Sequence, residues 1–270
     1  MIALSDEDLA ALARAKRTLE HPSLAIRLAD KVGMPVEALL RRLPAAAQEK
    51  VADGTRRALD TALGVALKTL AGKPRAGPSD WLHRGLVVAS GAAGGLAGIA
   101  GLVVELPVSL TLMLRSIADH AAAQGEDLGQ VSARLECLTV FAYGGRSPDD
   151  DAASSSYFAA RAALGRAVSQ AAQFVAERGV TEALGEKSAP ALVQLLGKVA
   201  QRLGVAVGDK AAAQLVPLIG AAGGAAVNAL FMAHYQDAAW AHFTVRRLER
   251  AHGADAVRAA YDRVDGGAAA

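Results

Sequence analysis

The sequence predicts an all-α protein, a multi-helix bundle packed around two apolar segments that are rich in glycine and alanine. No stretch alternates apolar and polar residues convincingly with a period of two, so we expect no strands. Outside the two segments, apolar residues recur at the three- and four-residue spacing of amphipathic helices. The hydrophobic content of 52% comes mainly from Ala, Leu and Val, with 27 glycines and only 4% aromatic residues. Such a bundle would pack through small side chains.

The two segments are Leu86–Val104 and Ala211–Ala233, and each is uncharged and contains the string GAAGG. A bilayer span needs about 20 apolar residues, so the first segment is long enough to cross a membrane. Five glycines and five alanines in it contribute little transfer energy, however. The second contains Gln214, Pro217 and Asn228, which a lipid-facing helix would have to hide. We therefore expect two helices buried in protein, with two membrane spans as the alternative.

The N-terminal region, residues 1–78, is expected to form several helices. Ser5–Asp8 is a capping box with acidic residues in the first turn, so a helix should run from about Asp6 to Glu20. Pro22 and Pro35 are suited to the first position of two short helices. A long amphipathic helix should follow Pro44 and end before the Gly- and Pro-rich linker 72–78.

Residues 79–252 are expected to form the core of a single domain that spans residues 1–270. Proline disfavours helical geometry at the preceding residue and lacks a backbone donor. The first central helix should therefore break near Pro107. Further helices are predicted at about 107–123, 131–142, 151–178, 190–203 and from Pro217 to about 252, followed by a short helix at 254–264 in the tail 253–270.

Composition and motifs exclude several classes of function. With 29 basic and 27 acidic residues, the net charge of +2 does not suggest nucleic acid as a partner. Cys137 is the single cysteine and no secretory signal pattern is visible, so we expect a cytoplasmic protein. The sequence contains no P-loop, dinucleotide fingerprint, HExxH, CxxC or GxSxG motif. We therefore expect no cofactor and no metal.

Charges in apolar surroundings are the first candidates for a site. Glu105 follows the first apolar segment directly, and burial would require it to find a partner or hold its proton. We favour a carboxylate near a helix start that pairs with an arginine; a ligand-facing or proton-handling group and a metal ligand are the alternatives. Arg115 and Asp119 are one turn apart and should form an ion pair, or join Glu105 in a polar site.

The helix that follows the second segment carries the other candidates. His234 and Asp237 share a face, and His242 lies about 80° from His234. With Glu105 they could form a metal site, but core or capping histidines are the favoured interpretation because the Glu-x-x-His pattern of bundle metal proteins is absent. Arg246 belongs to an arginine-rich helix end that is either a solvated face or a contact with an anionic membrane surface.

A series of strings occurs in order along nearly the whole chain: Gly33–Glu37, Leu43-Pro44, Glu105–Pro107, Leu112–Asp119, Gly125–Leu128, Glu136–Leu138, Phe141–Arg146, Tyr157, Arg161–Leu164, Ala221–Asn228 and His242–Arg250. Together these strings resemble the EcsC protein family of bacteria. Two departures from the family are visible: Ser109-Leu110-Thr111 replaces a pair of threonines, and Ala233 replaces an acidic residue, which weakens a metal site there.

The resemblance implies an intracellular, membrane-related accessory protein, because the family is named from a gene neighbour of a bacterial ABC transporter. Its biochemical role is not established. The main hypothesis is therefore a non-enzymatic helical protein that binds a membrane surface, at its inner face, or holds a lipid or acyl chain. By family analogy an ABC transporter is a partner.

Two alternatives stay open. A hydrolase or metal-dependent enzyme would use Glu105, Arg115, Asp119, His234 or His242, and at least three of these would have to converge on one substrate atom. A scaffold or interaction protein would show a large exposed apolar patch.

Overall fold

The computed structural model describes residues 4–20, 44–71, 85, 98–143, 156–185, 189–214 and 220–264. Within these residues the chain is helical and contains no strand, as predicted. The predicted short helices after Pro22 and Pro35, the linker 72–78 and the first GAAGG string lie outside the described residues. The helices are α1 (Asp6–Glu20), α4 (Ala45–Thr69), α6 (Gly98–Ala123), α7 (Val131–Thr139), α8 (Ser156–Arg178), α9 (Val180–Gly185), α10 (Pro190–Gln214), α11 (Gly220–His252) and α12 (Ala254–Arg263), with a 3₁₀ turn, η1 (Val140–Ala142), after α7.

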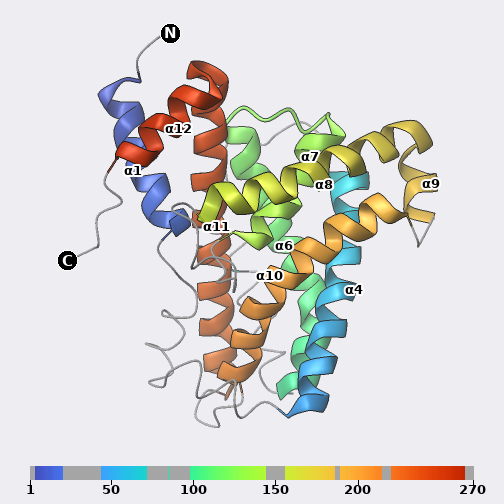
Figure 1. The fold of residues 1–270 in the computed structure, drawn as a ribbon. Coiled ribbons are helices and arrows are strands. Elements are labelled where there is room, and N and C mark those ends of the chain that lie inside the picture. The colour runs from blue at the N-terminus through green and yellow to red at the C-terminus, as the bar shows by residue number, and fades with distance from the viewer. Residues whose placement is uncertain are drawn as a thin grey trace.

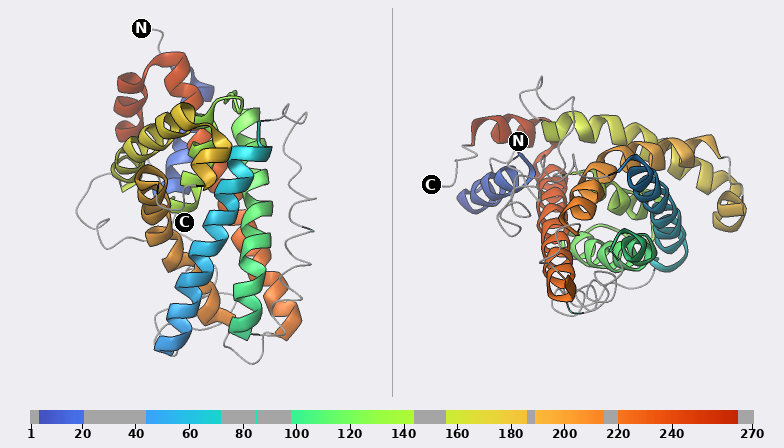
Figure 2. Two further views of the ribbon diagram at one scale, coloured as in Figure 1. Left: turned by 90° about the vertical axis from the view of Figure 1, so that its right-hand side faces the viewer. Right: turned by 90° about the horizontal axis from the view of Figure 1, so that it is seen from below.

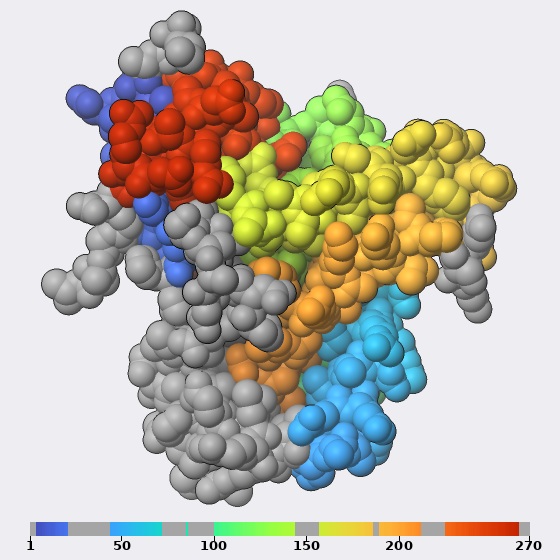
Figure 3. Space-filling model, viewed as in Figure 1, coloured from blue at the N-terminus to red at the C-terminus, as the bar shows by residue number. Residues whose placement is uncertain are grey.

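Four long helices, α4, α6, α10 and α11, form the body of the bundle (Figure 1). The 33 residues of α11 make it about 50 Å long, and it runs the height of the molecule. Helix α4 packs beside α6, and both α6 and α10 contact α11. Helix α8 lies across α10 in the upper part of the molecule, as the space-filling view shows (Figure 3).

Helix α6 continues through Pro107, so the predicted break at this residue is wrong. A proline inside a helix costs about 3 kcal/mol. Leu102, Leu106, Leu110 and Met113 are fully buried on one face of α6, on both sides of the proline. Each buried side chain of this size contributes about 1.5–3 kcal/mol, so their combined burial exceeds the local cost. Pro107 itself is only half-buried, away from this packed face.

A small side chain allows close packing between α4 and α6. A Cβ atom placed on Gly54 of α4 would lie only 3.2 Å from Cγ1 of Val103 on α6. Small residues allow helices to approach each other closely. The described chain shows it at Gly54, which the sequence pattern did not single out.

Helices α1 and α12, the first and last of the described helices, pack together at one end of the bundle. Gly253 adopts φ +90, a conformation that favours glycine, and this turn folds α12 back beside α11 and α1 (Figure 2). From α1, the Lys16 ammonium donates to the carbonyls of Tyr261 and Val264 at 2.9 and 3.0 Å. Because these carbonyls end α12, the contact also satisfies groups that the helix itself leaves unpaired.

The opposite ends of the bundle differ in chemistry. We call the first the apolar end; it consists of residues 98–108 of α6, 205–211 of α10 and 225–232 of α11. The other, the charged end, contains Glu126, Glu136, Arg161, Arg246 and Glu249.

Replacement of Gly54 by leucine tests the close packing of α4 against α6. Overpacking of this kind costs about 1–3 kcal/mol, so Gly54→Leu should lower the free energy of unfolding by that amount in urea denaturation. Gly64→Leu on the same helix is the matched control, because a Cβ there meets nothing within 4 Å. Equal stability of the two variants would contradict the assignment of Gly54 to the helix interface.

Candidate functional site

A buried polar cluster joins three helices inside the apolar end. The carboxylate of Glu105 on α6 lies 3.0 Å from Lys210 Nζ on α10, through Oε2. Its Oε1 accepts a hydrogen bond of 2.7 Å from the Asn228 amide on α11. Lys210 is completely buried and lies over the Phe231 ring, 5.2 Å from its centroid. Glu105 therefore does find a partner, but the partner is a lysine and not the arginine that we favoured.

Burial is the largest influence on the pKa of Lys210 and lowers it, against the charge and hydrogen bond of Glu105. A buried ion pair adds little net stability, because desolvation of the two charges offsets their attraction. Loss of one partner is a different matter, since it leaves the other charge buried and uncompensated. The cluster consequently acts as a constraint on how the three helices pack.

Substitution of Lys210 tests this constraint. Lys210→Met should destabilise the protein by about 3–5 kcal/mol in urea denaturation, and the double variant with Glu105→Gln should regain much of that loss. The control is Arg178→Ala, which breaks the exposed pair with Glu182 and should cost no more than about 0.5 kcal/mol. A double variant no more stable than Lys210→Met alone would contradict the pairing.

At the charged end, arginines pair with carboxylates in bidentate geometry. Arg246 of α11 donates to Glu126 at 2.8 and 3.0 Å, and Arg250 also contacts this carboxylate. Arg161 of α8 donates to Glu249 of α11 at 2.7 and 2.6 Å. Burial alone would raise the pKa of Glu126, but hydrogen bonds and charges from Arg246 and Arg250 outweigh it and lower the pKa. These arginines are therefore held by partners within the protein.

Behind these pairs, His242 is completely buried between a tyrosine and a carboxylate. Its Nδ1 lies 2.9 Å from the Tyr157 hydroxyl, and its Nε2 lies 3.1 Å from Oε1 of Glu136. Burial raises the pKa of Tyr157, so the tyrosine keeps its proton. Tyr157 can then donate to Nδ1 while Nε2 carries the imidazole proton and points it towards Glu136. The two partners therefore assign the tautomer of His242 that has its proton on Nε2.

Both members of the His242–Glu136 contact have a lowered pKa. For His242, burial is the dominant cause and outweighs the hydrogen bond and charge of Glu136. For Glu136, burial acts to raise the pKa, but the contact with His242 and the charges of Arg246 and Arg161 outweigh it. A neutral histidine beside an ionised glutamate is the state that these directions indicate near neutral pH.

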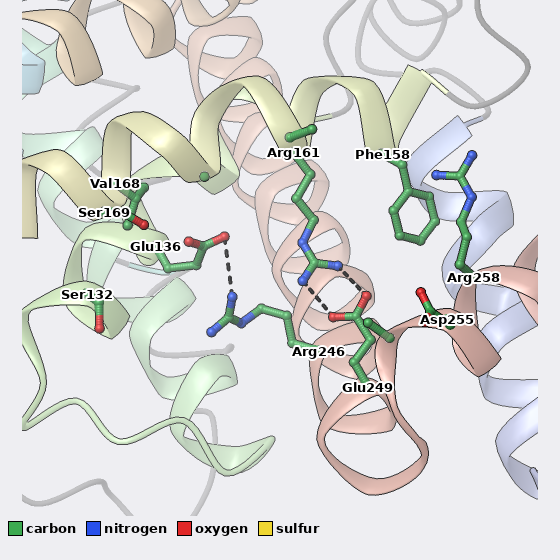
Figure 4. A pocket seen from close by; sticks show the side chains of 13 residues that line it. Ser132, Glu136, Phe158, Arg161, Val168, Ser169, Arg246, Glu249, Asp255 and Arg258 are labelled. Carbon is green, nitrogen blue, oxygen red and sulfur yellow. Dashed lines mark hydrogen bonds and ion pairs between the residues drawn. The ribbon is translucent and has the colours of Figure 1, made fainter. Parts of the chain in front are cut away.

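Glu136, Arg161, Arg246 and Glu249 also line an open pocket of about 480 Å³ between α7, α8, α11 and α12 (Figure 4). Phe158 and Arg258 form another part of its wall, with the Arg258 guanidinium 4.2 Å from the centre of the Phe158 ring. Cys137 adjoins Glu136 on α7 but is fully buried, and burial raises the pKa of its thiol. It is therefore not suited to a nucleophilic role in this pocket.

A model of the EcsC protein family matches residues 6–248 of the chain. The chain belongs to the EcsC protein family. Searches of curated proteins and of solved structures found no match. The EcsC match includes the Glu105 cluster and the Tyr157–His242–Glu136 contacts, and it ends before α12. The side of the pocket formed by Arg258 therefore lies beyond the matched residues.

The sequence-predicted residues of this EcsC protein do not converge on one point. Asn228, which contacts Glu105, precedes His242 by fourteen residues on α11, so the two sites are about 21 Å apart along the helix. A substrate atom shared by Glu105 and His242 is excluded by this distance. Arg115 is exposed and its guanidinium lies 3.4 Å from Thr69 Oγ1 on α4, in place of the ion pair with Asp119 that the spacing predicted.

The remaining predicted residues lie on α6 and α11. Asp119 is half-buried on α6, one turn beyond Arg115. His234 is buried, and its ring contacts the ring of Tyr235 with centroids 5.0 Å apart. Asp237 is half-buried nearby. Among the described residues no group of three His, Cys, Asp or Glu side chains is arranged to hold a metal ion, so the alternative site with Glu105, His234, Asp237 and His242 does not form there.

Lys210 is the site residue that sequence reasoning missed most clearly, although a signal was present. Glu105 is the one charged residue between Arg84 and Arg115, and Asp209 and Lys210 are the two between Arg202 and His234. A carboxylate beside one uncharged segment and a lysine beside the other indicate a pair between Glu105 and Lys210. Glu136, Tyr157 and Arg161 entered only through the family resemblance.

The lowered pKa of His242 predicts how stability depends on pH. As the pH falls below about 6.5, the unfolded chain takes up a proton that the folded protein does not, so the free energy of unfolding should decrease. His242→Gln can keep both contacts through its amide but does not titrate. Its stability should therefore change less than that of the wild type between about pH 7 and pH 5, as measured by urea denaturation. Parallel pH profiles would show that His242 titrates normally.

Proposed function

We propose that this EcsC protein associates with a membrane surface and that its apolar end makes the contact. The observation that carries the proposal is the outward face of α6. Val104 is 78% exposed and Val108 is 52% exposed on a helix that is otherwise built for a core. Gly101 and Leu112 continue the same stripe, and its first charged residue is Arg115, about two turns beyond Val108.

The neighbouring helix α4 shows what an ordinary solvated face looks like in this protein. Its exposed residues include Glu49, Lys50, Asp53 and Arg56. Charged side chains are well solvated by water, whereas exposed valines are unfavourable there by roughly 25 cal/mol per Å² of apolar surface. The two helices pack side by side, so the contrast is specific to α6 and supports an apolar environment for its outward stripe.

Sequence next to this stripe points in the same direction. The uncharged run Leu86–Val104 leads directly into the exposed part of α6. By length and composition alone, Ala100–Ala123 could cross a bilayer, with a mean hydropathy of 1.5, but half of it is buried within the protein. A helix that buries one face in protein and exposes an apolar face is suited to lie against a membrane surface.

Two further features are compatible with this proposal. Glu105 and Lys210 of the apolar end are paired with each other inside the protein, and Glu105 also contacts Asn228, so this buried pair would not enter an apolar phase as bare charges. The arginines of the charged end are engaged by Glu126 and Glu249, which argues against the alternative contact through Arg246 with anionic lipid. Association through valines should accordingly depend little on lipid charge or salt. An accessory role beside an ABC transporter, at the inner face of the membrane, is part of the same proposal.

Flotation with phosphatidylcholine vesicles tests the proposal. The wild type should float with these neutral vesicles at both low and high salt, because the contact is apolar. The double variant Val104→Asp/Val108→Asp should lower the bound fraction by about tenfold or more. The two valines would no longer be buried in the membrane, and this loss exceeds about 1.4 kcal/mol.

Val193→Asp is the matched control, because Val193 is 53% exposed but lies in the first turn of α10, away from the apolar end. Wild-type protein that stays in the soluble fraction would overturn the proposal. So would an equal loss of binding in the control variant. Binding that requires anionic lipid and disappears at high salt would instead favour a contact through basic residues.

A further inference from the structure

The pocket at the charged end contains a carboxylate whose bonding capacity is largely unused. Glu136 is only 8% exposed, and an ionised carboxylate can accept about four hydrogen bonds. Its contacts are with His242 at 3.1 Å, Thr139 at 3.5 Å and Arg246 at 3.7 Å, and all three are made to Oε1. No described residue hydrogen-bonds Oε2, although Glu136 lines the pocket.

A donor with unused capacity lies beside this acceptor. Arg246 donates to Glu126 through Nε and Nη2, and its Nη1 lies 3.7 Å from Glu136 Oε1, beyond hydrogen-bond distance. In Figure 4 the two side chains face each other across one side of the pocket. Arg161, which like Arg246 is half-buried, uses both of its terminal nitrogens on Glu249 and has less to offer a ligand.

The charges of the pocket wall balance. Three arginines, Arg161, Arg246 and Arg258, face three carboxylates, Glu136, Glu249 and Asp255. A wall of zero net charge does not select an anion or a cation. The unused acceptor of Glu136 and the unused donor of Arg246 line the same pocket and instead fit a neutral group that donates to the first and accepts from the second. Hydroxyl groups do both.

We propose that the pocket binds a small, uncharged, hydroxylated molecule such as a sugar or polyol. One hydroxyl would donate to Glu136 and accept from Arg246, in charge-assisted hydrogen bonds. The C–H groups of the ligand would lie against the apolar wall made by Phe158, Ala162 and Val168. The volume of about 480 Å³ is within the range of small-molecule pockets, about 300–1,000 Å³.

Two variants probe the pocket in different ways. Gly165 lies in its wall, in the middle of α8, and a Cβ placed there meets nothing within 4 Å. Gly165→Met would therefore fill the pocket without disturbing any charged pair. Gly197→Met on α10 is the matched control, because a Cβ there also meets nothing and Gly197 does not line the pocket. Glu136→Gln keeps the shape of the side chain and removes its charge.

Saturation-transfer difference NMR on the full chain provides the test. The probes are glucose, ribose and myo-inositol at millimolar concentration, compared with arginine, glutamate and inorganic phosphate. At least one hydroxylated probe should give a transfer signal, and Gly165→Met and Glu136→Gln should each weaken its affinity by about tenfold. Gly197→Met should leave the signal unchanged.

Three results would overturn the proposal. The first is no transfer to any hydroxylated probe, which would leave the charges as a structural network alone. The second is binding that Gly165→Met does not weaken, which would place the site elsewhere. The third is transfer to phosphate or to the amino acids but to none of the neutral probes, because the ligand class would then be charged. Circular dichroism confirms that each variant is folded before the comparison.

Discussion

The packing of the long helices depends on the pair formed by Glu105 and Lys210. Helices α6, α10 and α11 meet through Leu, Ala and Val side chains, and such surfaces alone specify register weakly. A shift of α10 by one residue would rotate Lys210 by about 100° and leave two charges without partners in an apolar interior. Asn228 extends the same requirement to α11. The register that is fixed at the apolar end also sets the positions of His242 and Arg246, which lie about 21 Å or more beyond Asn228 along α11.

The helical pattern could be predicted because it depends on local periodicity, and the places where it failed are instructive. The break expected at Pro107 follows from backbone chemistry alone, which takes no account of the leucines packed on both sides of it. The helix predicted to end at Leu203 continues to Gln214, because Val207 and Ala211 carry the same buried face onward past Gly204. In both cases tertiary packing prevails over a local signal.

The two polar clusters differ in how far the sequence could reveal them. Isolated charges lie next to both uncharged segments, so the contact of Glu105 with Lys210 was within reach of sequence reasoning. The contact of Tyr157 with His242 joins residues 85 positions apart, on helices that are rich in other polar side chains. Which of six histidines meets a tyrosine and a glutamate depends on how α7, α8 and α11 cross, and periodicity carries no information about crossing.

The hydrogen bonds from Lys16 to the last carbonyls of α12 affect the order in which the protein can assemble. The two partners are separated by 245 and 248 positions. During synthesis, α1 leaves the ribosome well before α11 and α12, with which it makes most of its described contacts. The cover that these two helices give to Leu12, Ala15 and Leu19 therefore forms only after most of the described chain has been translated.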